Sequence, residues 1–122
     1  MKSTAQIETL IKLMIQLQEI LKDFAELSKK KPNDQVNKFK LRLVNQVLET
    51  ANEIIDEKNK PFADFTVFDE NDLPSNSDVV LILTQYSACL QKFRKENIAM
   101  DDAHDRYWII NGKRSKIPYV GR

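Results

Sequence analysis

The sequence predicts an all-α fold: three antiparallel helices with a docked aromatic loop and a small C-terminal β-hairpin. Apolar residues recur at helical spacing in three long segments. Both glycines of the 122-residue chain lie within its last eleven residues, where an Asn-Gly pair follows an apolar run, a pattern typical of a tight hairpin turn. A chain of this length is one domain's worth, so residues 1–122 are assigned to a single helical domain.

The first helix is expected over residues 3–29. Ser3 followed by Gln6 resembles a capping box, and the lysines at 29–31 suit the C-terminal end of a helix. An apolar stripe at heptad spacing runs along one face. Its members are Ile7, Leu10, Met14, Leu17, Leu21 and Phe24, widened by Ile11, Ile20 and Leu27. The stripe fits either the core of this domain or a seam shared with a second chain, and both interpretations stay open.

The second helix is expected over residues 33–59. Pro32 suits the opening of a helix, and Pro61 cannot continue one. Its apolar stripe consists of Val36, Leu43, Val44, Val47, Leu48, Ala51, Ile54 and Ile55. The short connection before it makes the first two helices antiparallel neighbours.

Residues 60–76 form a connection that is long for a helical bundle. It is rich in aromatic residues, so we expect it to dock on the bundle, with a short strand at 65–68. The third helix is expected over residues 77–97. Its apolar face consists of Val79, Ile82, Leu83, Tyr86, Cys89, Leu90 and Phe93.

The C-terminal turn and hairpin are expected over residues 101–120. Asn111-Gly112 supplies the hairpin turn. The segment 101–105 before it has the composition of a single helical turn.

The composition excludes several classes of site. Residues 1–111 contain no glycine, which excludes glycine-rich phosphate loops and the nucleophile elbow. One cysteine and one histidine exclude an internal disulfide and multi-cysteine or multi-histidine metal centres. We therefore expect no cofactor, no metal and no enzymatic activity. The formal charge of +1, the polar N-terminus and the short apolar runs predict a soluble cytoplasmic protein without a membrane partner.

Three carboxylate groupings resemble metal sites. The pairs Asp23/Glu26 and Glu53/Asp56 have a metal-binding spacing, but a helical wheel turns three of the four away from the core, which favours solvated faces. Residues 69–72 invite a calcium loop. Proline and valine occupy the sixth and twelfth positions, where such a loop needs glycine and glutamate, so it is excluded.

His104 lies three residues after Asp101. This pair suits a metal ligand set or a general base, and the alternative is a capping and salt-bridge cluster at the start of a short turn.

Charge is segregated along the chain. Residues 61–78 hold five acids and no base, whereas residues 111–122 hold four bases and no acid. Either these segments pair with each other, or the aromatic and basic tail is a recognition surface, since Tyr, Trp and Arg are enriched at interface hot spots. The candidate partner-binding residues are Arg106, Tyr107, Trp108, Lys113, Arg114 and Tyr119.

The sequence therefore favours a non-catalytic protein–protein interaction module: an adaptor, a small subunit or an immunity-type inhibitor. Its partner is another protein, or a second copy through the first helix. One alternative is an accessory nucleic-acid-binding protein that uses the tail with Lys38, Lys40 and Arg42. A second alternative is a small metal-dependent hydrolase centred on His104.

Overall fold

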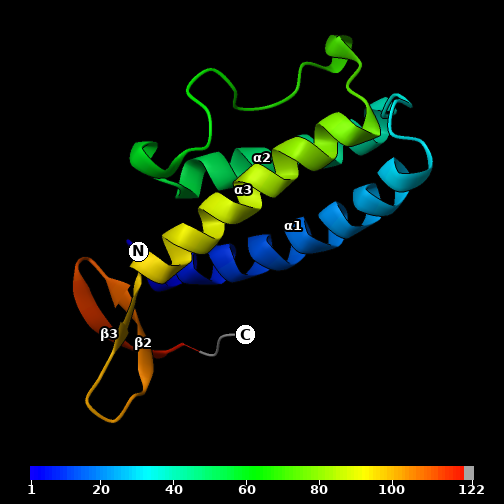
Figure 1. The fold of residues 1–122 in the computed structure, drawn as a ribbon. Coiled ribbons are helices and arrows are strands. Elements are labelled where there is room, and N and C mark those ends of the chain that lie inside the picture. The colour runs from blue at the N-terminus through cyan, green and yellow to red at the C-terminus, as the bar shows by residue number, and fades with distance from the viewer. Residues whose placement is uncertain (120–122) are drawn as a thin grey trace.

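The computed structural model describes residues 1–119 and consists of a helical bundle with a three-stranded antiparallel sheet at one end (Figure 1). The helices are α1 (Thr4–Lys30), α2 (Lys38–Ile54) and α3 (Asn76–Glu96), with short 3₁₀ helices at Glu57–Asn59 and Glu70–Asp72. The strands are β1 (Ile98–Met100), β2 (Arg106–Ile110) and β3 (Lys113–Pro118), in the order β1-β2-β3. The expectation of an all-α fold is therefore wrong in one respect, because the C-terminal part of the chain is a sheet.

The start of α1 follows its sequence closely. The Ser3 side chain accepts a hydrogen bond from the backbone N–H of Gln6, as an N-cap does. The Gln6 side chain accepts from the backbone N–H of Lys2 instead of Ser3, so the capping box is incomplete. The side chains that α1 buries are Ile7, Leu10, Leu13, Leu17 and Phe24. Most of the apolar stripe thus belongs to the core of this chain, whereas Ile11 is 46% exposed.

The start of α2 differs from the expected residue 33. Asn37 caps the helix, its side chain accepting from the backbone N–H of Lys40 at 2.8 Å. Before it, Gln35 forms an isolated antiparallel β-bridge with Ser75, and the N–H of Val36 donates to the Pro74 carbonyl at 2.9 Å. The backbone groups of Asp34 and Val36 thus bond to the segment around Pro74, and they are not available for the hydrogen bonds of a helix that starts at Asn33.

The end of α2 also differs from the expected residue 59. Ile55 has extended dihedrals of −71° and 130°, and a separate 3₁₀ turn follows at Glu57–Asn59. Both Ile54 and Ile55 are buried, so the chain turns here to place two consecutive apolar side chains in the core. Pro61 is not what ends the helix.

The connection between α2 and α3 docks on the bundle without forming a strand at 65–68. The Asn45 amide donates to the Phe68 carbonyl and accepts from the Phe68 N–H, both at 2.9 Å. Asn52 donates to the Thr66 carbonyl at 2.8 Å. Two side chains of α2 thus provide the backbone partners that a neighbouring strand would have provided. Apolar side chains from this connection pack partly buried against the core: Phe65, Val67 and Phe68.

The expected hairpin is present as β2 and β3. Asn111 and Gly112 both have positive φ, 53° and 76°, as a type I′ turn requires. Residue 120, the last of the expected hairpin, lies outside the described residues. β1 was not expected from the sequence; it pairs with β2 so that Ile98 lies opposite Trp108.

The sheet is tied to the ends of two helices. The N–H of Asn111 donates to the Met1 carbonyl and the N–H of Ile109 donates to the Asn97 carbonyl, both at 2.8 Å. The sheet therefore lies where α1 begins and α3 ends (Figure 1). Across residues 1–119, no helix combines the length and the apolar character needed to span a membrane.

Candidate interaction surface

Trp108 is a core residue. It lies in the middle of β2, only 2% of its surface is exposed, and its ring packs edge-to-face on Tyr119 with centroids 5.5 Å apart. Strand alternation places Tyr107 on the opposite face of β2. The expectation that Trp108 contributes to a recognition surface does not fit this burial, because a side chain enclosed in the core has no area left to offer a partner.

Two arginines converge on the ring of Tyr119. The guanidinium of Arg106 lies 5.0 Å from the ring centroid and that of Arg94, from α3, lies 5.6 Å from it. Neither guanidinium has a carboxylate partner within residues 1–119, and the Nε of Arg94 is buried there without a hydrogen-bond partner. We call Arg94, Arg106 and Tyr119 the arginine–tyrosine cluster. It holds two positive charges and unused donor groups.

Arg94 had no sequence pattern that pointed to it. It lies near the end of α3, far along the chain from Tyr119, and only the folded-back sheet brings the two together. The position of Arg94 in the sequence of α3 is the same as that of any polar residue next to the apolar face.

Tyr107 and Arg114 form a separate pair. The guanidinium of Arg114 lies 4.4 Å from the Tyr107 ring centroid and 3.3 Å from the carboxylate of Asp101. Arg114 lies opposite Ile109 in the register, which places it on the Tyr107 face of the sheet. Its charge is compensated locally, unlike the charge of the arginine–tyrosine cluster.

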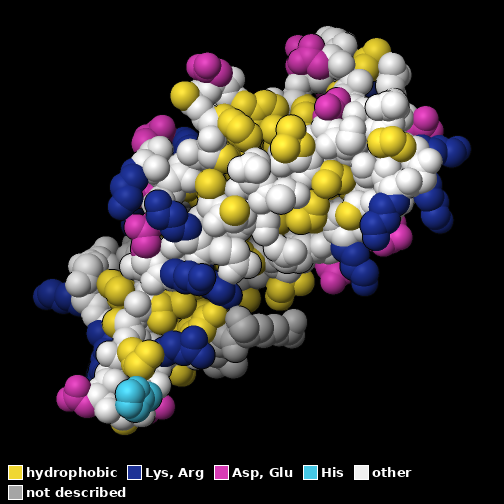
Figure 2. All heavy atoms as spheres, viewed as in Figure 1, with side chains coloured by type: hydrophobic (Ala, Val, Ile, Leu, Met, Phe, Trp, Pro, Cys, Tyr) yellow, Lys and Arg dark blue, Asp and Glu magenta, His cyan; other side chains and the backbone are white. Residues whose placement is uncertain are grey.

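Lys113 completes the predicted set. It lies opposite Ile110, is exposed, and has no ion-pair partner in the described part of the chain. Strand alternation puts Ile110 on the Trp108 face of β2. Because Lys113 lies directly opposite Ile110 on β3, its side chain is on the same face. The six predicted residues are therefore divided between the two faces of the sheet. Figure 2 shows Lys and Arg side chains bordering apolar ones in this region.

Residues 101–105 were expected to form a helical turn. Instead, Asp101 and His104 lie in the loop between β1 and β2. One Asp101 oxygen accepts from the backbone N–H groups of Ala103 and Asp105 at 3.0 and 2.9 Å, and the other contacts Arg114. The capping and salt-bridge interpretation of Asp101 is confirmed. His104 lies at the exposed tip with φ of 64° (Figure 2). Both oxygens of the carboxylate are thus engaged by groups other than the imidazole.

The paired carboxylates of the first two helical segments lie on solvated surfaces. Asp23 and Glu26 of α1, Glu53 of α2 and Asp56, which follows α2, are all exposed, whereas the helical wheel turned only three of the four away from the core. Among residues 1–119, no group of three or more His, Cys, Asp or Glu side chains is placed to hold a metal ion.

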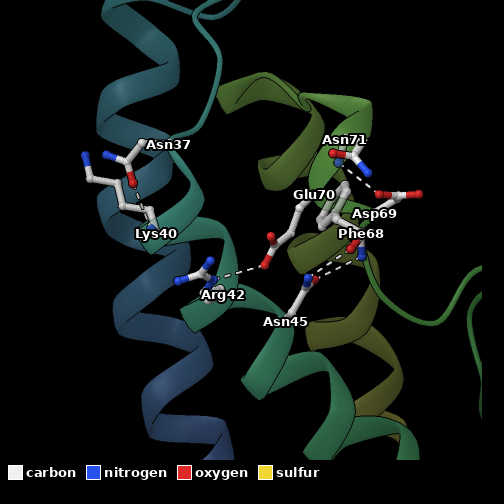
Figure 3. Close-up of polar contacts among 8 residues, drawn as sticks. All are labelled: Asn37, Lys40, Arg42, Asn45, Phe68, Asp69, Glu70 and Asn71. Atoms are coloured by element: carbon white, nitrogen blue, oxygen red, sulfur yellow. Dashed lines mark hydrogen bonds and ion pairs between the residues drawn. The ribbon is translucent and has the colours of Figure 1, made fainter.

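The acidic connection forms an ion pair with α2 instead of the basic tail. Glu70 pairs with Arg42 at 3.1 Å, and the Asp69 carboxylate accepts from the N–H of Asn71 at 2.8 Å (Figure 3). No ion pair joins residues 61–78 to residues 111–119. The interpretation that the two segments neutralise each other is wrong for these residues, because they contact different parts of the bundle; Arg122 lies outside the described residues.

Comparison with known proteins gives no family, relative or fold to which the chain is similar: no family model, no curated protein and no solved structure matches it. Any function must therefore be argued from the geometry of the chain itself.

Proposed function

We propose that the protein is a non-catalytic interaction module that binds an acidic segment of another protein through the arginine–tyrosine cluster. The observation that supports this is the convergence of Arg94 and Arg106 on one ring without a carboxylate partner in residues 1–119. A guanidinium donates two parallel hydrogen bonds to a carboxylate, and stacking on an aromatic ring leaves its edge free to do so. Arginine and tyrosine are also enriched at the centres of interfaces.

Exposed Lys113 extends the positive charge on this side of the sheet. The long bundle acts as the scaffold, since the hydrogen bonds of Asn111 and Ile109 fix the sheet to its end. A rigid positive surface of this kind suits an adaptor or a small subunit, which works by occupying a surface of its partner.

The geometry favours a protein over single-stranded nucleic acid as the partner. A single-strand platform needs open aromatic faces on which bases stack. Here Trp108 is buried, and the ring of Tyr119 is in contact with two guanidiniums and with Trp108. The other basic residues of the nucleic-acid alternative lie at the start of α2, near the far end of α1 and about 40 Å from the sheet for a helix of this length: Lys38, Lys40 and Arg42.

The test compares Arg106→Glu with Lys22→Glu in affinity purification from the source organism, with quantitative mass spectrometry. Lys22 is an exposed lysine on α1, so its reversal changes the net charge equally at a site away from the sheet. Arg106→Glu should lose a partner that the wild type and Lys22→Glu retain. An identical set of partners for all three proteins would contradict the proposal.

The same variants test the nucleic-acid alternative. A single-stranded oligonucleotide whose electrophoretic mobility is shifted by the wild type at low salt, but not by Arg106→Glu, would assign the cluster to phosphate binding instead.

A further inference from the structure

A groove of about 250 Å³ lies between α1 and α2. Buried Phe24 and Val44 form its floor, and Leu27 and Leu43 line it while 37% and 43% of their surfaces remain exposed. Ile20 completes the apolar lining. Every residue that lines the groove belongs to α1 or α2, so neither α3 nor the sheet contributes to it.

The groove lies on the side of α1 that faces away from α3. Gln18 donates a hydrogen bond to Ser87, which places α3 on one flank of α1. Ile20 is two residues further on, about 200° around the helix, and so lies on the other flank. Packing within the bundle therefore leaves this apolar surface uncovered.

Phe39 extends the uncovered surface. It is 69% exposed and precedes Leu43 by four residues, so the two side chains lie on one face of α2. A phenylalanine exposed next to an open apolar groove costs hydration free energy, which burial against a partner would recover.

The two sides of the groove carry opposite charges. Asp23 lines it from α1 and Lys40 lines it from α2. Both are exposed, and neither has an ion-pair partner in the stretch that the structure describes, residues 1–119. A partner that covers the groove must therefore present a positive group over α1 and a negative group over α2.

We propose that a second copy of this chain covers the groove, related by a two-fold axis parallel to it. This rotation lays α1 of one copy over α2 of the other at the same height along the groove. Asp23 of each copy then faces Lys40 of the other, and the two apolar surfaces meet between the charge pairs. The product is a four-helix arrangement with an isologous interface.

Charge complementarity selects the second copy over other occupants. A uniformly acidic or basic helix would meet a like charge on one side of the groove, at Asp23 or at Lys40. The groove of a second copy carries the same two charges, Asp23 on α1 and Lys40 on α2. The two-fold axis places each of these charges opposite the other, so that two attractive charge pairs form. The interface uses none of the residues of the arginine–tyrosine cluster, so the two proposals fail independently.

The first test is sedimentation velocity of the full chain from about 1 to about 100 μM, the range of weak self-association. We expect the wild type to be dimeric at the upper end. Leu43→Glu should be monomeric throughout, because it buries a charge in the apolar centre. Ile15→Glu is the matched control: Ile15 is 57% exposed but lies about 140° around α1 from Ile20, and its variant should remain dimeric.

The second test is a charge exchange at exposed positions that leaves the core untouched. Asp23→Lys and Lys40→Asp should each weaken self-association by about tenfold, because each homodimer places like charges opposite each other twice. A mixture of the two variants should form a heterodimer as strong as the wild-type dimer, since both contacts again join opposite charges. Native mass spectrometry distinguishes this heterodimer by mass.

Three results would overturn the proposal. The first is a wild-type chain that is monomeric at about 100 μM. The second is a Leu43→Glu variant that is helical by circular dichroism and still dimeric. The third is a mixture of charge variants that associates no more strongly than either alone, a result that excludes the two-fold arrangement even where Leu43→Glu fails to fold.

Discussion

The bundle and the sheet of this protein are held in place by different means. In the bundle, apolar side chains at helical spacing share one core, so each helix is fixed by many contacts of similar size. The sheet adds one fully buried side chain, Trp108, and a few partly buried ones to that core, and backbone hydrogen bonds join it to the ends of α1 and α3. The comparison shows that stability is distributed over many residues in one region and depends on very few in the other.

The connection between α2 and α3 resembles the sheet in this respect. Its middle is held by Asn45 and Asn52, through three hydrogen bonds to the backbone of Thr66 and Phe68. Removal of a single side chain from either the sheet or the connection should therefore release that segment locally. Removal of one core side chain that a helix contributes should instead weaken the bundle as a whole.

The largest effect is expected for Trp108→Ala. Truncation of a buried tryptophan costs about 3–5 kcal/mol, from lost apolar contacts and the cavity that remains. Amide exchange of Ile109, whose N–H donates to the Asn97 carbonyl, should speed up far more than exchange in the middle of α3. Ile109→Ala, on the opposite face of β2, is the control and should cost less. Equal loss of protection in α3 and in the sheet would show that the two regions unfold together.

The helices were predictable because their pattern is local. Ser3 and Ser75 cap α1 and α3, and the observed bounds Thr4–Lys30 and Asn76–Glu96 lie one residue from the expected ones. The start of α2 was not predictable, because the segment before it pairs with residues near Pro74, a contact between distant parts of the chain. β1 has the same cause: it is a strand only because β2 folds back on it. The end of α2 differs for another reason, since both Ile54 and Ile55 are buried.

The candidate surface was predictable only in composition. The sequence shows which aromatic and basic residues lie near each other along the tail, but not which face of the sheet each occupies. That depends on the helices against which β2 packs, and it buries Trp108 while leaving Lys113 exposed. The exposed groove likewise depends on where α3 lies, because the stripe on α1 alone does not show which flank α3 covers.

A smaller effect is expected for Asn45→Ala. It leaves both the N–H and the carbonyl of Phe68 without their protein partner, which costs about 1–2 kcal/mol. Amide exchange at Phe68 should accelerate while exchange in α1 stays unchanged, because the connection lies on the surface of the bundle. Gln46→Ala, at the next position, removes an exposed side chain and should change amide exchange neither at Phe68 nor in α1. Unchanged exchange at Phe68 in the Asn45 variant would mean that its aromatic neighbours suffice to hold the connection.

The smallest effect is expected at Glu96, the last residue of α3, where the helix meets the sheet. Hydrogen bonds from Lys58 at 3.2 Å and Asn59 at 2.9 Å lower the pKa of this carboxyl below its ordinary value of 4.5. The unfolded chain therefore takes up the proton at higher pH than the folded one. The stabilisation is complete above pH 4.5 and is lost as the pH falls through the lower pKa of the folded state.

Glu96→Gln should accordingly flatten the fall in unfolding free energy on acidification, as measured by urea denaturation from neutral pH to below pH 4.5. Glu53→Gln removes the same charge from an exposed side chain of α2 that makes no hydrogen bond within residues 1–119, and should retain the wild-type slope. If both variants kept the wild-type slope, the contacts of Glu96 would not stabilise the fold. The link between α3 and Glu57–Asn59 would then rest on the apolar side chains around it, as the rest of the bundle does.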